Sequence, residues 1–221
     1  MKRQIFALIF LCMATSAFAQ QAGGRGGGRG PAPQPPPLFF KETWKEAPGN
    51  VPVTQDFVTN PDLQLNLYPG TVKDDFGVTS EGNVPHIWTG LCSSSCALTL
   101  SSRTNFFDLT GKAKIHWYTK TSGFHEVRPL LKLADGTFLI GDHVDANTFD
   151  YKESEIYLAE VRWLKLDMPK VQTKGDLLDK VDLSKVDAIG FADLTPGSGH
   201  GSGGYSDVAW IEVYGKPVKR D

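Results

Sequence analysis

Polar and apolar side chains alternate along a short run in the middle of the chain, Lys112–Thr119 (KAKIHWYT). Successive side chains of a β-strand point to opposite faces, so Ile115 and Trp117 share one face while His116 and Tyr118 share the other. A carbohydrate site needs aromatic rings that stack on the apolar side of a sugar, beside polar groups that bond its hydroxyls. The run therefore indicates a strand with one buried face and one face able to bind a glycan.

Residues of the same types elsewhere extend this candidate site. Trp88 and Trp163 could add stacking platforms, while Arg128, Asp193 and His200 could bond sugar hydroxyls. The alternative for each tryptophan is a place in the core, which is the commoner position for a tryptophan on a strand. The predicted ligand-binding set is Trp88, His116, Tyr118, Arg128, Trp163, Asp193 and His200.

His200 lies within a loop of glycine, serine and proline, PGSGHGSGGYSD, between two apolar runs. The loop lacks the Lys-Ser/Thr ending of a phosphate-binding P-loop, so it indicates a flexible or ligand-covering segment. His200 is a candidate ligand contact, metal ligand or general base, against the alternative of an exposed loop histidine.

No set of residues in the chain selects a reaction. Histidines and acids near the predicted strand ends could supply acid–base chemistry, and a glycosidase needs two carboxyls flanking the bond. Their spacing matches no nucleophile elbow, zinc-binding H-E-x-x-H or Cys/His dyad. We assign no catalytic residue and keep a glycan-cleaving enzyme, a hydrolase or lyase on a concanavalin-like jelly roll, as the alternative. A cell-surface interaction protein is a third possibility.

Cys92 and Cys96 stand close together in the phrase LCSSSCA. In an oxidising compartment such a pair predicts a disulfide. A metal site would need two further ligands, and the sequence offers no paired histidine or second cysteine pair nearby. We therefore expect a disulfide that stiffens one surface loop, and no cofactor.

The N-terminal segment predicts export. Met1–Ala19 has two basic residues, an apolar stretch and an Ala-Phe-Ala cleavage motif, which is the pattern of a signal peptide. Gln20–Pro37 is rich in glycine, arginine and proline and has no apolar surface to bury, so we expect a disordered linker. Leu38–Asp221 then forms one domain of a periplasmic or extracellular protein.

The charge of this predicted domain argues against nucleic acid as a partner. Leaving out the four basic residues of the first 37 positions reduces 23 basic residues to 19, against 25 acidic residues, a net charge of −6. Nucleic-acid binding needs a basic stripe instead. No segment is apolar over the length that spans a bilayer, so a membrane span is not expected either.

Short strands must position the candidate residues. Apolar runs recur between glycine, proline, asparagine and aspartate, without a long helical period. Lys112–Thr119, Val127–Leu133 and Phe138–Gly141 predict a three-stranded meander, and Ala188–Leu194 and Val208–Tyr214 predict the closing strands. Eight or more strands with few helices indicate an all-β protein, a single-domain β-sandwich of the jelly-roll type.

The order of phrases in the second half resembles a known family. FDLTGKAKIHW, VRWLKLDMP, VDLSKVDAIGF and VAWIEVYG follow one another between Asn105 and Gly215. This order is similar to that of galactose-binding-like jelly-roll domains, especially the carbohydrate-binding modules of secreted bacterial glycanases. The resemblance implies a domain that recognises a carbohydrate on a concave sheet face.

The resemblance also raises the question of a structural calcium ion. Many of those modules place a pair of acidic residues in the last strand. Here Asp207 precedes that strand and Glu212 lies within it, which departs from the family pattern. Calcium therefore stays open as an alternative to the expectation of no cofactor.

Overall fold

The computed structural model describes residues 34–69, 76–196 and 204–220, and all structural statements concern these residues. They form seventeen strands and one short 3-10 helix, η1 (Gln55–Phe57). No helix among them is long and apolar enough to cross a membrane. The predicted signal peptide, most of the predicted linker and His200 lie outside the described residues.

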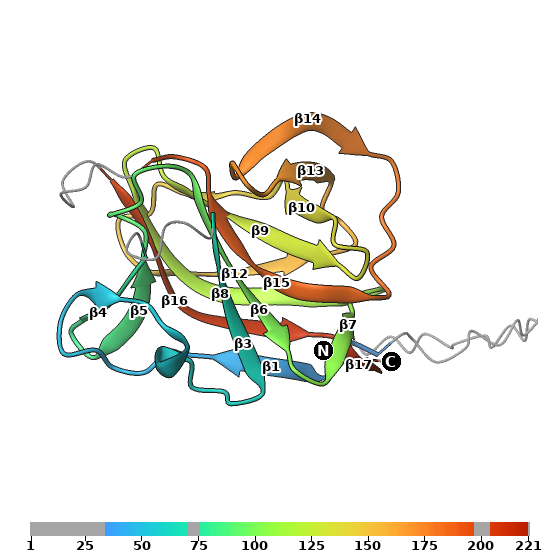
Figure 1. Ribbon diagram of the computed structural model, residues 1–221, viewed down its shortest axis with the longest axis horizontal. Helices are drawn as coiled ribbons and strands as arrows, with labels where there is room; N and C mark the ends of the chain where they lie inside the picture. The colour runs from blue at the N-terminus through green and yellow to red at the C-terminus, as the bar shows by residue number, and fades with distance from the viewer. Residues whose placement is uncertain (1–33, 70–75, 197–203, 221) are drawn as a thin grey trace, which may run out of the picture. The chain divides into compact units, whose positions relative to one another are not determined.

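Seven strands form the first sheet, called sheet A (Figure 1). Six of them follow one another in space: β12 (Lys152–Tyr157), β8 (Lys114–Ser122), β16 (Tyr205–Tyr214), β5 (Val84–Trp88), β4 (Gly77–Glu81) and β2 (Val51–Pro52). The seventh, β1 (Leu38–Glu42), pairs with the C-terminal half of β16, while β5 pairs with its N-terminal half. The long strands β8 and β16 therefore form the middle of this sheet.

Ten strands form the second sheet, called sheet B. Seven of them follow one another in space: β14 (Gln172–Leu178), β13 (Trp163–Asp167), β10 (Phe138–Gly141), β9 (Glu126–Leu133), β15 (Val186–Asp193), β6 (Cys96–Ser102) and β3 (Leu63–Tyr68). The others are β11 (Asp145–Ala146), which pairs with β9, and β7 (Asn105–Asp108), which pairs with β15 and with β17 (Lys216–Lys219).

The chain changes sheet between β8 and β9 and again between β15 and β16. In sheet A β8 pairs with β16, and in sheet B β9 pairs with β15, all antiparallel. Such crossings between two packed sheets are typical of jelly rolls, and the predicted all-β sandwich is confirmed. The predicted meander is wrong in its first member, because only β9 and β10 pair. The reason is that β8 and β9 each bury one face against the opposite sheet.

The core lies between the sheets and follows the alternation of the strands. On β8, Ile115 and Trp117 are fully buried, and Ile211 and Val213 of β16 bury the same side. They pack in one cluster with side chains of sheet B such as Leu131. Each large aliphatic side chain buried in this way stabilises the fold by about 2 kcal/mol. The side chains between these positions consequently point to the outer face of sheet A.

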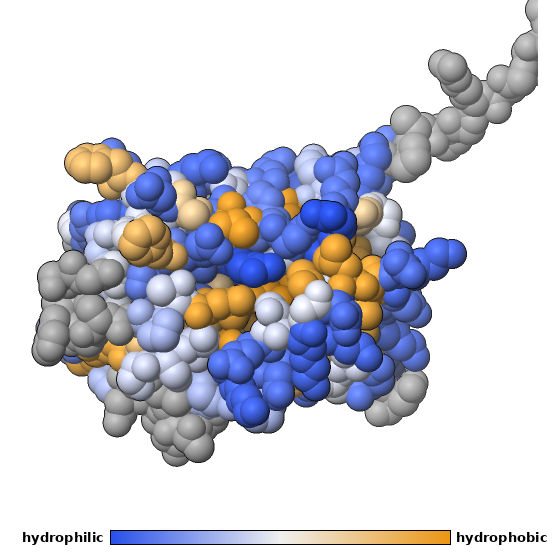
Figure 2. All heavy atoms as spheres, turned by 90° about the horizontal axis from the view of Figure 1, so that it is seen from above, coloured by the Kyte–Doolittle hydropathy of each residue, from blue (hydrophilic) through white to orange (hydrophobic). Residues whose placement is uncertain are grey.

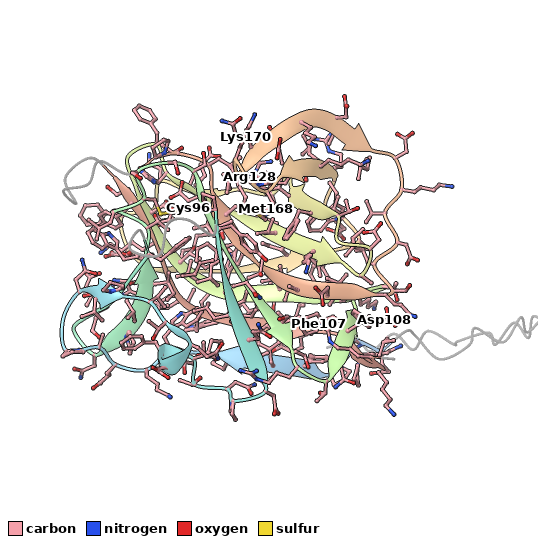
Figure 3. The ribbon with its side chains drawn as sticks, viewed as in Figure 1. Cys96, Phe107, Asp108, Arg128, Met168 and Lys170 are labelled. Atoms are coloured by element: carbon pink, nitrogen blue, oxygen red, sulfur yellow. A yellow bond between two sulfur atoms is a disulfide. The ribbon has the colours of Figure 1, made fainter. Side chains whose placement is uncertain are left out.

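A smaller hydrophobic cluster covers part of the outer face of sheet B. Met168 and Val171, from the turn between β13 and β14, pack with Leu130 and Ile140. Seen from the side of β14, hydrophobic residues run across the molecule between hydrophilic ones (Figure 2). Arg128 lies on this side of the molecule together with Met168 (Figure 3). The outer face of sheet B is therefore partly used for packing.

Candidate functional site

The outer face of sheet A gathers aromatic and charged side chains from neighbouring strands. Tyr118 of β8 lies opposite Trp210 of β16, and His116 lies opposite Glu212. Cross-strand partners share a face, so the side chains predicted to bind a ligand on β8 meet a matching set on β16. A β-bulge between Val208 and Trp210 sets the alternation of β16 in this region.

Three rings stack side by side on this face. Tyr118 lies between Tyr151 and Trp210, with ring centroids 4.9 Å and 5.7 Å apart and interplanar angles of 29° and 20°. The Lys41 Nζ atom lies 4.7 Å from the centroid of the Trp210 ring. Because rings cover both faces of Tyr118, this residue offers a ligand its edge and hydroxyl rather than a stacking face. We call this stack of Tyr151, Tyr118 and Trp210 the aromatic wall of sheet A.

His116 connects this stack to two carboxylates. Its ring packs edge-on against Trp210, with centroids 4.7 Å apart. Its Nδ1 lies 3.1 Å from Glu212 and its Nε2 lies 3.3 Å from Glu153. Burial raises the pKa of Glu212, but hydrogen bonds, of which that from Lys41 is the strongest, outweigh burial and lower the pKa overall. Glu212 is therefore an ionised acceptor whose oxygens are already engaged.

The part of the outer face of sheet A formed by β4 and β5 carries Trp88, which is partly exposed. Gly77, Trp88, Asp207 and Lys120 lie opposite one another on β4, β5, β16 and β8. A Cβ atom added to Gly90 would come within 2.4 Å of the Trp88 indole, and one added to Gly77 within 3.2 Å. The indole therefore lies against the backbone at both glycines, which a larger residue would prevent.

Trp88 forms part of an open pocket of about 310 Å³ on this face. The pocket is lined by one tryptophan, one tyrosine, one histidine, two acids and three small polar residues: Trp88, Tyr205, His86, Glu81, Asp207, Asn50, Thr79 and Ser80. An aromatic surface ringed by hydrogen-bonding groups has the chemistry of a sugar-binding pocket.

Asp207 is the unusual group of the pocket. Its side chain is almost fully buried, and its Oδ1 has no hydrogen-bond partner among the described residues. Burial, reinforced by Glu81 and opposed by Lys120, raises the pKa of Asp207 to about 8. Burial also lowers the pKa of His86, whose Nε2 lies 3.6 Å from Asp207 Oδ1. The two groups are therefore both uncharged near neutral pH and do not form an ion pair.

A buried polar network lies behind the pocket at the end of the sandwich. Asp193 Oδ2 accepts hydrogen bonds from Thr89 at 2.9 Å and Ser206 at 2.8 Å, and lies 2.7 Å from Nδ1 of His125. Asp193 Oδ1 accepts a bond from the backbone N–H of Thr195 at 3.1 Å. Thr89 follows Trp88 and Ser206 precedes Asp207, so this network holds the two strand ends that carry the pocket.

The structure brings three of the seven predicted ligand-binding residues together. Trp88, His116 and Tyr118 share the outer face of sheet A. Asp193 is fully buried in the network behind it, and Trp163 is 3% exposed in the core. Arg128 is not on this face, and His200 is not among the described residues.

Arg128 is half-buried on β9, in sheet B. Its guanidinium donates two hydrogen bonds to the backbone oxygen of Gly141, at 3.0 Å and 2.7 Å. Burial lowers the pKa of this guanidinium. Arg128 therefore joins β9 to the end of β10, and His200 falls outside the described residues.

Several residues of the site were missed by sequence reasoning, namely His86, Tyr151, Tyr205, Asp207 and Trp210. Trp210 alternates with Glu212 and Tyr214 along β16, and that alternation was a usable signal. Asp207 falls out of the same phase because of the bulge. Tyr151 precedes its strand and reaches the face only through tertiary packing.

The predicted disulfide is confirmed, since Cys92 and Cys96 are bonded, with Cα atoms 6.3 Å apart. Within the described ranges no group of three or more His, Cys, Asp or Glu side chains is placed to hold a metal ion. Asp207 and Glu212, considered for calcium, are five positions apart on one strand, roughly 16 Å. Glu212 moreover accepts bonds from Lys41 and Tyr214. These two residues do not form a calcium site together.

Comparison with known proteins gives structural matches only. No family model and no curated protein matches the chain. A family 11 carbohydrate-binding module of the cellulase Lic26A-Cel5E of Clostridium thermocellum is similar, with 17% identity and a TM-score of 0.44 over 77% of this chain and 97% of that chain. A family 29 carbohydrate-binding module complexed with cellulohexaose has 12% identity and a TM-score of 0.42, over 80% and 92%. PfGH50B has 13% identity and a TM-score of 0.43, over 73% and 23%.

Proposed function

We propose that this chain is an exported carbohydrate-binding protein that holds a glycan on the outer face of sheet A. The observation that carries the proposal is the pocket at Trp88, where an indole held against two glycines is surrounded by hydrogen-bonding side chains. The signal-peptide pattern of Met1–Ala19 and the disulfide support export.

The two halves of the face have different roles in this proposal. Trp88 supplies the stacking surface for a sugar ring, and Asp207, His86 and Tyr205 bond its hydroxyls. The wall of Tyr151, Tyr118 and Trp210 borders the face, with the Tyr118 edge and the charged pairs of Lys41 and His116 beside it. A chain of sugars would lie across β5, β16 and β8.

The first test is incubation of the purified mature protein with insoluble polysaccharides, followed by measurement of protein lost from solution. We expect depletion by at least one polysaccharide, and about tenfold weaker retention for Trp88→Ala, because truncating an aromatic anchor of a binding site costs more than about 1 kcal/mol and tenfold corresponds to about 1.4 kcal/mol. The control is Leu177→Ala, which removes an exposed apolar side chain from β14 in sheet B. Equal retention of Trp88→Ala and the wild type would contradict the proposed site.

A glycan-cleaving enzyme is the second candidate, and one observation favours it. An Asp that keeps its proton near neutral pH is the kind of group that protonates a glycosidic oxygen, and Glu81 lines the same pocket as Asp207. Release of sugar products in the same incubation, lost in Asp207→Ala, would establish this activity. If the incubation shows no depletion of the protein and no release of sugar products, a protein-interaction role would be favoured.

A further inference from the structure

We propose that Asp207 binds the glycan as an un-ionised carboxylic acid, donating a hydrogen bond to a sugar oxygen while His86 Nε2 accepts a hydrogen bond from a sugar hydroxyl. This inference rests on the proposed function and assigns the donor and the acceptor within its pocket. Its consequence is that retention of the glycan depends on pH, with binding at neutral pH and loss of binding in alkali.

The position of the Asp207 carboxyl is the first argument. The side chain is only 4% exposed, yet its Oδ1 has no hydrogen-bond partner among the residues described. A buried polar atom without a partner is destabilising and therefore needs an explanation, for which we infer a bound ligand here. The pocket that this residue lines also contains the Trp88 indole, against which a sugar ring can stack.

The tautomer of His86 is the second argument. Its Nδ1 lies 3.0 Å from the backbone oxygen of Val84. A carbonyl oxygen only accepts, so Nδ1 carries the proton and, in the neutral ring, Nε2 carries a lone pair. The His86 Nε2 atom lies 3.6 Å from Asp207 Oδ1, a distance that is too long for a direct hydrogen bond. In the proposed complex one sugar hydroxyl bonds both atoms, accepting from the acid and donating to the imidazole.

The charges that face Asp207 come from four strands. On β8, Lys120 donates two hydrogen bonds to Glu81 of β4, at 2.7 Å and 3.0 Å, so its charge is already balanced. On β5, His86 is neutral. On β16, Tyr205 lines the pocket, and Tyr151, which precedes β12, packs against the His86 ring. The unpaired acid therefore has no cation of its own to hold it ionised.

Tyr151 strengthens the same arrangement. Its hydroxyl is buried without a partner among the described residues, and burial raises its pKa, so it keeps its proton. Its ring packs edge-on against His86, with centroids 5.9 Å apart. With Asp207 protonated, the pocket offers a donor at Asp207 beside an acceptor at His86 Nε2, which matches a sugar that both donates and accepts. With Asp207 ionised, Oδ1 and His86 Nε2 become two acceptors facing one hydroxyl.

The test is affinity electrophoresis of the mature protein in gels that contain mixed-linkage β-glucan, xylan, galactomannan or pectin, each at pH 6 and pH 9.5. Gels without polysaccharide correct for changes in mobility. We expect retention at pH 6 and, since only a few per cent of Asp207 keeps its proton at pH 9.5, roughly 30-fold weaker affinity there. Asp207→Asn, whose amide remains a donor at every pH, should be retained equally at both. Asp182→Asn is the matched control, because Asp182 is exposed.

The outcomes separate this inference from the function on which it rests. Retention of the wild type that does not change with pH, or loss of retention by Asp207→Asn at pH 6, overturns the inference and leaves glycan binding in place. No retention in any gel at either pH overturns the proposed function and the inference with it. Carbon NMR of the free wild-type protein adds a readout that needs no ligand or variant. An Asp207 carboxyl that titrates below pH 6 also overturns the inference.

Discussion

Thr89 and Ser206 hold each other through two hydrogen bonds. The Ser206 backbone N–H donates to Thr89 Oγ1 at 2.8 Å, and the Thr89 backbone N–H donates to the backbone carbonyl oxygen of Ser206 at 3.0 Å. Both hydroxyls then donate to Asp193 Oδ2. Trp88 directly precedes Thr89, and Asp207 directly follows Ser206. The hydrogen bonds between Thr89, Ser206 and Asp193 therefore fix the distance between Trp88 and Asp207 in the pocket.

Asp193→Ala should therefore impair the fold and the site together. The change leaves the buried hydroxyls of Thr89 and Ser206 and the ring of His125 without their common acceptor, and each orphaned group costs about 1–3 kcal/mol. We expect the free energy of unfolding, measured with urea, to fall by roughly 3–5 kcal/mol. Glycan retention by the remaining folded protein should weaken as well. Asp182→Ala is the control, and equal stability of the two variants would contradict the role of Asp193.

Asp207→Asn should raise the stability near neutral pH. The folded-state pKa of about 8 lies above the usual value of 3.8, so between these values the unfolded chain has lost a proton that the folded protein keeps. Stability then falls as the pH rises from about 4 to 8 and levels off above 8. The variant removes this loss, and we expect a gain of about 4 kcal/mol at pH 7 and almost none at pH 4. Urea unfolding at both pH values measures it, and equal gains at both would contradict the raised pKa.

Gly90→Ala should weaken glycan retention by moving the Trp88 indole. The new Cβ atom would lie 2.4 Å from the ring, so the ring must shift away from its position in the pocket. We expect about tenfold weaker retention with the domain still folded. In a Trp88→Ala background the same change should cost nothing more, as a double-mutant cycle reveals. An equal loss in both backgrounds would show that the glycine acts on the backbone instead.

Trp163 and Trp88 should respond differently to truncation. Trp163 is 3% exposed within the core, so Trp163→Ala should lower the free energy of unfolding by about 3–5 kcal/mol. Trp88→Ala should change it by less and abolish most of the retention. Thermal unfolding and polysaccharide depletion, measured on both variants below their melting temperatures, test this contrast. Loss of retention by a folded Trp163→Ala would return Trp163 to the ligand-binding set.

Removal of the disulfide should affect stability modestly. The bond between Cys92 and Cys96 closes a very short loop, for which the chain-entropy account gives roughly 2 kcal/mol. The Cys92 backbone N–H also donates to the backbone carbonyl oxygen of Thr89 at 2.9 Å, and this bond links the loop to the buried network behind the pocket. Replacing both cysteines with serine should therefore lower the melting temperature and weaken retention slightly. An unchanged melting temperature would show that the loop is held by its other contacts.

The alternation of residue types was enough to predict the strands and their faces. Ile115 and Trp117 are buried while His116 and Tyr118 share the outer face, as the period of two requires. Alternation does not say which strands are neighbours. β8 was expected beside β9, but pairs with β16 and β12, because pairing is chosen by packing between residues far apart in the sequence.

The sequence by itself determined the all-β class, the disulfide and the inward or outward side of the clearest strands, since these depend on local periodicity and spacing. Only the tertiary structure decided which side chains form a site. It placed Asp193 and Trp163 inside the protein and brought His86, Tyr151 and Asp207 to one end of sheet A. The physical reason is that the raised pKa of Asp207 comes from burial and from the charge of Glu81, and both depend on β4, β5, β8 and β16 being neighbours in sheet A. No single stretch of sequence records those contacts.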